Sequence, residues 1–169
     1  IGAQLNDGNG YRSGHVRIYN YNGSSWTQIG QDIDGEASSD QSGHSVSLSD
    51  NGHILAIGAP NNDGAGNDAG HVRIYEYNGI SWIQLGQDID GEATDDWSGE
   101  AVSLSSDGNT VAIGASRNDG SFHNAGHVRI YNWNGTSWIQ VGADIDGKET
   151  YDISGWSISL SNDGNTVAI

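Results

Sequence analysis

The chain has 169 residues, enough for one ordinary domain, and 22 acidic against 6 basic residues give it a net charge of −16. This charge excludes a nucleic-acid partner, because phosphate backbones are bound by clustered Lys and Arg, and it disfavours an anionic membrane surface. The absence of cysteine excludes thiol catalysis, disulfides and thiolate metal sites. No apolar run is long enough for a transmembrane helix, so no membrane insertion is expected.

A unit of 56 residues recurs three times and sets the domain organisation. The motif Gly-His-Val-Arg-Ile-Tyr begins at positions 14, 70 and 126, and Asp-Ile-Asp-Gly begins at 32, 88 and 144. We therefore predict a single repeat region over residues 1–169, with units 1–56, 57–112 and 113–168. Because the sequence contains no methionine, we expect the biological polypeptide to be longer.

Apolar residues alternate with period two in each unit, which is typical of β-strands. The four strands expected around the second unit are, in chain order, 43–49, 54–59, 71–77 and 81–85. Glycine-containing turns at Gly52 and Gly79 join them in pairs, since glycine adopts the positive φ that a tight hairpin needs. The glycine-rich segment 60–70 and the acidic segment 86–98 are expected to be loops.

The fold class predicted from these strands is all-β, built of β-propeller blades. Four short strands cannot bury both faces of their sheet alone, so each unit is expected to stack on its neighbour, as propeller blades do. A two-layer sandwich is the alternative, but it would not give each unit an identical neighbour. The unit boundaries fall between second and third strands, which predicts two whole blades flanked by two partial ones. We expect an arc of a larger propeller, with half of a six-bladed dimer as the alternative.

The order of motifs resembles the FG-GAP repeat. The matching segments are Ser-Gly-His-Ser-Val-Ser-Leu at 42–48, Leu-Ala-Ile-Gly-Ala-Pro at 55–60 and Gly-His-Val-Arg-Ile-Tyr at 70–75. The resemblance implies blades like those of integrin alpha chains and of microbial and algal surface proteins, and therefore an extracellular or cell-surface adhesion role. Ser-Gly replaces the family's Phe-Gly, and the family's long calcium loop is here only Asp-Asn-Gly at 50–52. That loop is too short for a cation that takes about six to eight oxygens, so the family's calcium site is not transferred.

A different acidic segment supplies the candidate metal ligands. In this segment, carboxylates stand at alternate positions and a glycine follows the second of them, which is how some calcium loops begin. The candidates are Asp32, Asp34, Glu36, Asp88, Asp90 and Glu92. Lys148 takes the place of the glutamate in the third unit. The alternative is a solvated connection between blades in which aspartates cap turns, and calcium is the one cofactor considered.

A histidine and an arginine recur on one face of every third strand, for example His71 and Arg73. We expect a structural ladder in which each arginine pairs with an aspartate or stacks on an aromatic ring. The alternative is a ring of histidines around a channel. Histidines that lie 56 residues apart have no metal-ligand spacing within a unit.

Two tryptophans and two asparagines are further site candidates. Trp97 and Trp156 break the repeat and are predicted ligand-surface residues, whereas the repeated tryptophans are expected in packing. Asn22 and Asn134 begin Asn-Gly-Ser and Asn-Gly-Thr sequences, which are N-glycosylation acceptors if the protein is secreted.

The sequence contains no nucleophile elbow, phosphate-binding glycine loop or His-Glu-x-x-His pair. We therefore predict that the protein is not an enzyme but an extracellular repeat module for adhesion, structural assembly or protein or glycan interaction. A calcium-dependent, lectin-like carbohydrate binder and a carboxylate-based hydrolase are the alternatives. The expected partners are a protein or glycan ligand or further copies of the same repeat, including a homo-oligomer that completes a ring.

Overall fold

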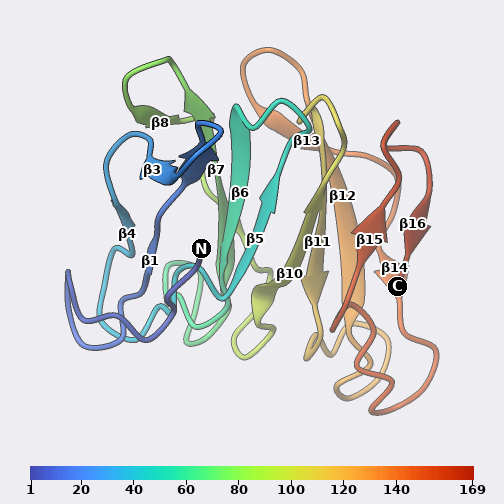
Figure 1. The fold of residues 1–169 in the computed structure, drawn as a ribbon. Helices are drawn as coiled ribbons and strands as arrows, with labels where there is room; N and C mark the ends of the chain where they lie inside the picture. Colours follow the sequence, from blue (N-terminus) through green and yellow to red (C-terminus); the bar gives the residue numbers. More distant parts are fainter.

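A computed structural model describes residues 1–169, and all of its regular secondary structure is β-strand. The strands form two five-stranded and three two-stranded sheets, which stand side by side in chain order (Figure 1). The all-β part of the predicted fold class is therefore confirmed, while these sheets do not close into a ring. The structure contains no helix with the length and apolar character needed to cross a membrane.

In space the repeat begins at residues 42 and 98, so from here on the first, second and third units are residues 1–41, 42–97 and 98–153. The second unit contributes one complete antiparallel sheet. Its strands are β5 (Ser45–Leu48), β6 (Ile54–Ala59), β7 (His71–Tyr77) and β8 (Trp82–Gln84), hydrogen-bonded in that order. These four strands agree with the four predicted from the alternation. A fifth, β9 (Ile89–Asp90), corrects the prediction that the whole acidic segment is a loop. Because β8 pairs only with the end of β7, the start of β7 is free to pair with β9.

The third unit repeats this arrangement. Its strands are β10 (Ser98–Leu104), β11 (Thr110–Ala115), β12 (His127–Trp133), β13 (Trp138–Gln140) and β14 (Ile145–Asp146). β14 pairs with the start of β12, as β9 does with β7. The repeat in the sequence is thus a repeat in strand pairing.

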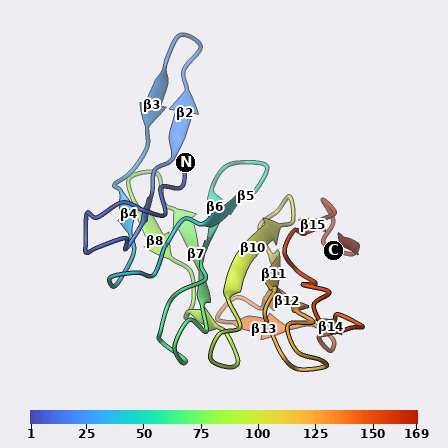
Figure 2. The ribbon, with the colours of Figure 1, turned by 90° about the horizontal axis from the view of Figure 1, so that it is seen from below.

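Incomplete sheets flank the two complete ones. The first unit has β1 (His15–Val16), β2 (Tyr19–Tyr21), β3 (Trp26–Gln28) and β4 (Ile33–Asp34), and the last segment has β15 (Ser159–Leu160) and β16 (Val167–Ala168). β2 pairs only with β3, and this hairpin stands out from the other sheets (Figure 2). β16 pairs only with β15.

The hydrophobic core lies between neighbouring sheets. Val102 and Leu104 of β10 pack with Val72 and Ile74 of β7 in one cluster of buried residues. A second cluster joins side chains of the first and second units, among them Ile18 and Trp82. Each sheet therefore buries its face on the next unit, as the four-stranded pattern required.

Candidate functional site

A cluster of charged and polar side chains lies at each junction between units. His71 and Arg73 alternate on β7, so their side chains share a face. The pairing of β9 with the start of β7 brings Asp88 to the same place. Glu36 comes from the preceding unit. We call Glu36, His71 and Asp88 the first triad.

The nitrogen and oxygen atoms of the first triad that could bind a metal all lie within 4.8 Å of one another. His71 Nδ1 is 3.6 Å from Asp88 Oδ2. The Arg73 guanidinium lies between the two acids, with its Nε 3.2 Å from Asp88 Oδ1 and its Nη2 against Glu36. Gln84 donates a further hydrogen bond to Asp88. The cluster thus has two carboxylates and one permanent positive charge.

The second triad, Glu92, His127 and Asp144, repeats the first at the next junction. His127 Nδ1 is 3.6 Å from Asp144 Oδ2. Arg129 is placed differently from Arg73, because its Nη1 lies 3.3 Å from Glu92 and its Nη2 donates to the Asp90 carbonyl. The buried Nε of Arg129 has no hydrogen-bond partner. No ion pair joins Arg129 to Asp144, which instead accepts a hydrogen bond from Gln140.

The first unit has no such triad. Arg17 donates to Asp32 through Nε at 2.9 Å and through Nη2 at 2.7 Å. His15 Nδ1 lies 4.0 Å from Asp34. The structure therefore does not gather Asp32, Asp34 and Glu36 at one point: the two aspartates face their own unit, whereas the glutamate faces the next.

Three of the six predicted metal ligands, Glu36, Asp88 and Glu92, lie in the triads. Asp32, Asp34 and Asp90 do not, and His71, His127 and Asp144 were missed. Each triad combines residues of two units, so ligand spacing within one unit does not reveal it. A signal was present, since the glutamate precedes the histidine by 35 residues and the aspartate follows it by 17 in both triads (71 − 36 and 127 − 92; 88 − 71 and 144 − 127).

Burial sets the charge state of the histidines. Desolvation lowers the pKa of His71 below 6.5, and the nearby Asp88 opposes this only in part. Desolvation and the charge of Arg129 lower the pKa of His127 in the same way. Both imidazoles are therefore neutral at pH 7, the form in which a ring nitrogen can accept a proton or bind a metal.

Acid should weaken the Arg17–Asp32 pair. The hydrogen bonds from Arg17 and Gln28 lower the pKa of Asp32 from 3.8 to about 2. A depressed carboxylate pKa stabilises the folded state above pH 3.8, and this contribution is lost as the pH falls from 3.8 towards about 2. The Asp32→Asn chain should therefore lose less of its stability across that window than the unmodified chain. Urea unfolding at a series of pH values measures this, and parallel curves for the two chains would contradict it.

A polar cavity of about 430 Å³ opens beside the first triad. Its lining residues are Glu36, Arg73, Gln84, Gly86, Gln87, Asp88 and Asp90. Both carboxylates of the first triad therefore face a space that a solute can enter.

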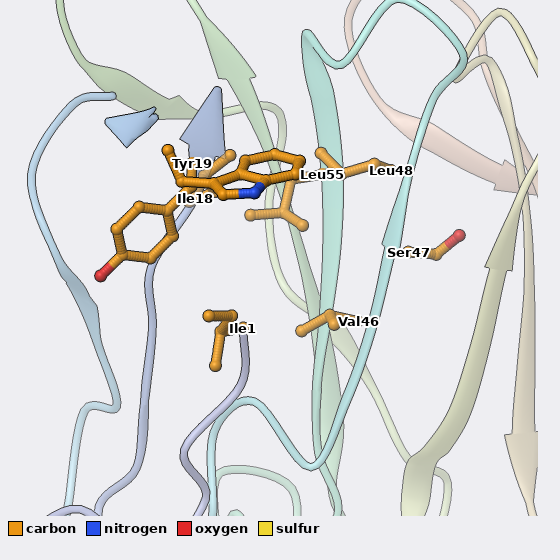
Figure 3. A pocket seen from close by; sticks show the side chains of 8 residues that line it. Ile1, Ile18, Tyr19, Val46, Ser47, Leu48 and Leu55 are labelled. Carbon is orange, nitrogen blue, oxygen red and sulfur yellow. The ribbon is translucent and has the colours of Figure 1, made fainter. Parts of the chain in front are cut away.

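A second cavity of about 540 Å³ is apolar and lies between the first unit and the second (Figure 3). We call it the apolar groove, and it is lined by Ile1, Ile18, Tyr19, Trp26, Val46, Ser47, Leu48 and Leu55. Val46 and Leu48 are 40% and 48% exposed there, whereas their counterparts Val102 and Leu104 are 9% and 7% exposed. The same repeat positions are thus covered at one junction and open at the other.

The tryptophans and glycosylation candidates stay predictions. Trp156 is 61% exposed, whereas Trp97 is half-buried with the guanidinium of Arg117 stacked 3.4 Å from its ring centre. Asn22 and Asn134 are exposed in the β2–β3 and β12–β13 turns. Each uses its side-chain oxygen to accept hydrogen bonds from the turn backbone.

No family model matches the chain, and no curated protein matches it. Among solved structures, the chain is similar to a candidate 6-phosphogluconolactonase from Bacteroides uniformis, with a TM-score of 0.57 and 14% identity. The match covers 90% of this chain and 40% of that one. The likeness concerns the fold, and the chain spans two fifths of the length of the solved protein.

The prediction of a non-enzymatic repeat module is contradicted by this likeness, because the similar protein is named as an enzyme, whereas the extracellular location stays a prediction. The prediction relied on the absence of a catalytic motif within one unit. The structure instead gathers histidine and carboxylates from two units at each junction. The lectin-like alternative depended on a calcium loop at Asp32, Asp34 and Glu36, whose side chains do not converge. Neither prediction is retained.

Proposed function

We propose that the chain is an arc of a β-propeller whose unit junctions bind a divalent metal ion for the hydrolysis of a small polar ester. The side-by-side repetition of the four-stranded sheets supports the arc. The coverage of 40% of a longer solved chain supports a ring of more units than these. The single observation that carries the metal site is the occurrence of two equivalent triads with the same spacing and the same geometry.

The ligand types favour a metal ion that accepts both nitrogen and oxygen ligands. Each triad offers one neutral imidazole and two carboxylates, a set that suits Zn²⁺ or Mn²⁺ better than Ca²⁺, which takes oxygen ligands. The second triad is the better site because the Arg129 guanidinium contacts Glu92 and forms no ion pair with Asp144, whose one side-chain hydrogen bond to the protein comes from Gln140. At the first triad, Arg73 contacts both acids and competes with the ion.

The proposed chemistry follows from the number of ligands. An ion held by three side chains keeps a position for water and lowers the pKa of that water towards neutrality. Held by Glu92, His127 and Asp144, the ion would supply an activated water for ester hydrolysis, in which the C–O bond to the leaving alcohol breaks and the alcohol oxygen takes up a proton. The neighbouring Arg129 guanidinium would stabilise the negative charge that develops on the carbonyl oxygen. The name of the similar protein suggests a cyclic ester of a sugar acid as the substrate class.

Zinc titration followed by calorimetry tests the binding step. The Glu92→Gln chain should lose at least about tenfold in affinity at the second triad, because one of its two carboxylate ligands is removed. Glu76→Gln is the matched control, since Glu76 is exposed on β7 outside both triads. The Arg129→Gln chain should bind more tightly, because a competing positive charge is gone. Equal affinities in all four chains would contradict the site.

Hydrolysis of a sugar-acid lactone tests the catalytic step. Zinc-loaded protein should accelerate ring opening, and EDTA should abolish the acceleration. In the double variant His71→Ala, His127→Ala, the rate of ring opening should fall at least about a hundredfold, because no ion then remains to activate water. Proton release, followed by a pH indicator, measures the rate. If protein that calorimetry shows to be zinc-loaded opens the lactone no faster than buffer alone, the proposed hydrolysis is rejected while the proposed zinc binding stands.

A further inference from the structure

Asn-Gly pairs occur at five positions in the chain, and the structure divides them into two groups. Three pairs form the turns that join β2 to β3, β7 to β8 and β12 to β13, and we call these the hairpin turns: Asn22-Gly23, Asn78-Gly79 and Asn134-Gly135. The other two pairs are Asn9-Gly10 and Asn51-Gly52. An Asn-Gly pair is chemically reactive, because glycine has no Cβ to keep its backbone nitrogen away from the side chain of the asparagine before it.

The glycine nitrogen is free in each of the hairpin turns. Gly23, Gly79 and Gly135 lie outside the strands, and their N–H groups donate to no acceptor in the protein. A side chain built on any of these glycines would meet nothing within 4 Å, and the three asparagines are exposed. The nitrogen that would attack is therefore unoccupied, and water reaches the turn.

The glycine nitrogen is occupied in the other two pairs. Gly52 donates to the Ser49 carbonyl at 2.9 Å, and Gly10 donates to the Asp7 carbonyl at 3.2 Å. Attack by either nitrogen would first have to break this hydrogen bond. The difference is not one of exposure, since a side chain built on Gly52 would also meet nothing within 4 Å.

The side-chain carbonyl that would be attacked is polarised in the hairpin turns. Asn22 Oδ1 accepts hydrogen bonds from the backbone nitrogens of Ser24 and Ser25, each at 3.0 Å, and from the Ser24 hydroxyl at 2.9 Å. Asn134 Oδ1 accepts the equivalent bonds from the turn that follows it. Donors placed in this way stabilise the negative charge that develops on the oxygen when a nucleophile attacks the carbon.

Asn78 and Asn51 each lack one part of this arrangement. Asn78 Oδ1 accepts from the backbone nitrogens of Ile80 and Ser81 alone, because isoleucine has no hydroxyl. Asn51 Oδ1 accepts from a hydroxyl and a backbone nitrogen, both at 2.9 Å, but its glycine nitrogen is occupied. The chain therefore contains its own controls for the carbonyl and for the nucleophile.

We propose that Asn22, Asn78 and Asn134 are sites of spontaneous deamidation through a cyclic imide, whereas Asn9 and Asn51 are protected. The glycine nitrogen loses its proton and forms a bond to the asparagine Cγ, and the bond from Cγ to the side-chain nitrogen breaks, which releases ammonia. Water then opens the imide at either carbonyl and leaves aspartate or isoaspartate. The reaction needs no ion or partner, so it does not depend on whether the triads bind a metal.

The hydrogen bonds predict an order of rates. Asn22 and Asn134 should convert at least about threefold faster than Asn78, because each has one more donor on the attacked carbonyl. Asn51 and Asn9 should convert at least about fivefold more slowly than Asn78, which is the effect of one ordinary hydrogen bond that must be broken. Asn9 is held further, since its side-chain nitrogen donates to the Gly35 carbonyl at 2.8 Å.

Peptide mapping by mass spectrometry measures the conversion at each pair in folded protein kept in mildly alkaline buffer. The protein is made in a bacterial host, so that no sugar is attached to Asn22 or Asn134. Isoaspartate is diagnostic, because direct hydrolysis of the side-chain amide gives aspartate alone. In urea all five pairs should convert at similar rates, because the hydrogen bonds are lost. The proposal is overturned if the folded chain forms no isoaspartate at the hairpin turns while the unfolded chain does, or if Asn51 converts as fast as Asn78.

Two substitutions at Ile80 test the contribution of the hydroxyl. Ile80 is 83% exposed, so neither change should disturb the core, and circular dichroism checks this. Ile80→Ser should raise the rate at Asn78 to that at Asn134, because the new hydroxyl can donate to Asn78 Oδ1 as the Thr136 hydroxyl does to Asn134. Ile80→Ala is the matched control and should leave the rate unchanged. Equal rates at Asn78 in the two variants would contradict the role given to the hydroxyl.

Discussion

Replacing Trp82 by alanine is expected to destabilise the fold by about 3–5 kcal/mol, the usual cost of deleting a buried tryptophan side chain. Trp82 is 2% exposed, packs in the cluster shared by the first and second units, and donates to the Ile29 carbonyl. The substitution would remove this contact area and leave a cavity between two units. Chemical denaturation followed by circular dichroism measures the loss.

The repeat provides a matched control for that substitution. Trp26 occupies the same position in the first unit but is 69% exposed. Trp26→Ala should cost less than about 1 kcal/mol in dilute, monomeric protein, because little buried area is lost. Equal losses for the two variants would show that packing between the first and second units does not stabilise the fold.

The Gly58→Ala chain should lose at least about 3 kcal/mol, at the upper end of the cost of overpacking. A methyl group at Gly58 would lie well inside van der Waals contact with the Gly99 carbonyl oxygen of the next sheet. Because the opposing atom is backbone, no side-chain rotation can make room. The two sheets would have to separate, and the core between them would open.

Gly120→Ala is the control for the glycine substitution. Gly120 also has no positive φ, but the nearest atom to its added methyl group would be a side-chain oxygen of Asn118. Its loss should be no more than about 1 kcal/mol. Thermal unfolding of both variants compares them, and a Gly58→Ala chain as stable as this control would rule out the close approach of the two sheets.

The strands could be predicted from the sequence because their signal is local. The expected strands 54–59 and 71–77 agree with β6 and β7, whose side chains alternate between the two faces of the sheet. β9 could not be predicted in this way. Its residues pair with β7 only because β8 is short, and that depends on how three segments meet in space.

The candidate site was predictable in its residue types but not in its assembly. Glu36 stands in a plain acidic run, and nothing near it in the sequence indicates that it faces the next unit. His71 gains its carboxylate neighbours from a strand pairing and from a different unit. The functional prediction considered each unit alone, whereas both triads take their side chains from two units.

The close approach at Gly58 recurs along the chain and has a consequence for how such arrays vary. The counterparts Gly2 and Gly114 face the Gly43 and Gly155 carbonyl oxygens in the same way. The main chains of neighbouring sheets therefore lie in contact at each of these three glycines. We expect the curvature of the array to be set by these backbone contacts and not by the side chains on its loops. Loops such as 60–70 can diverge in sequence from copy to copy without altering the path of the array. An inserted copy of the unit would lengthen the array along the same arc.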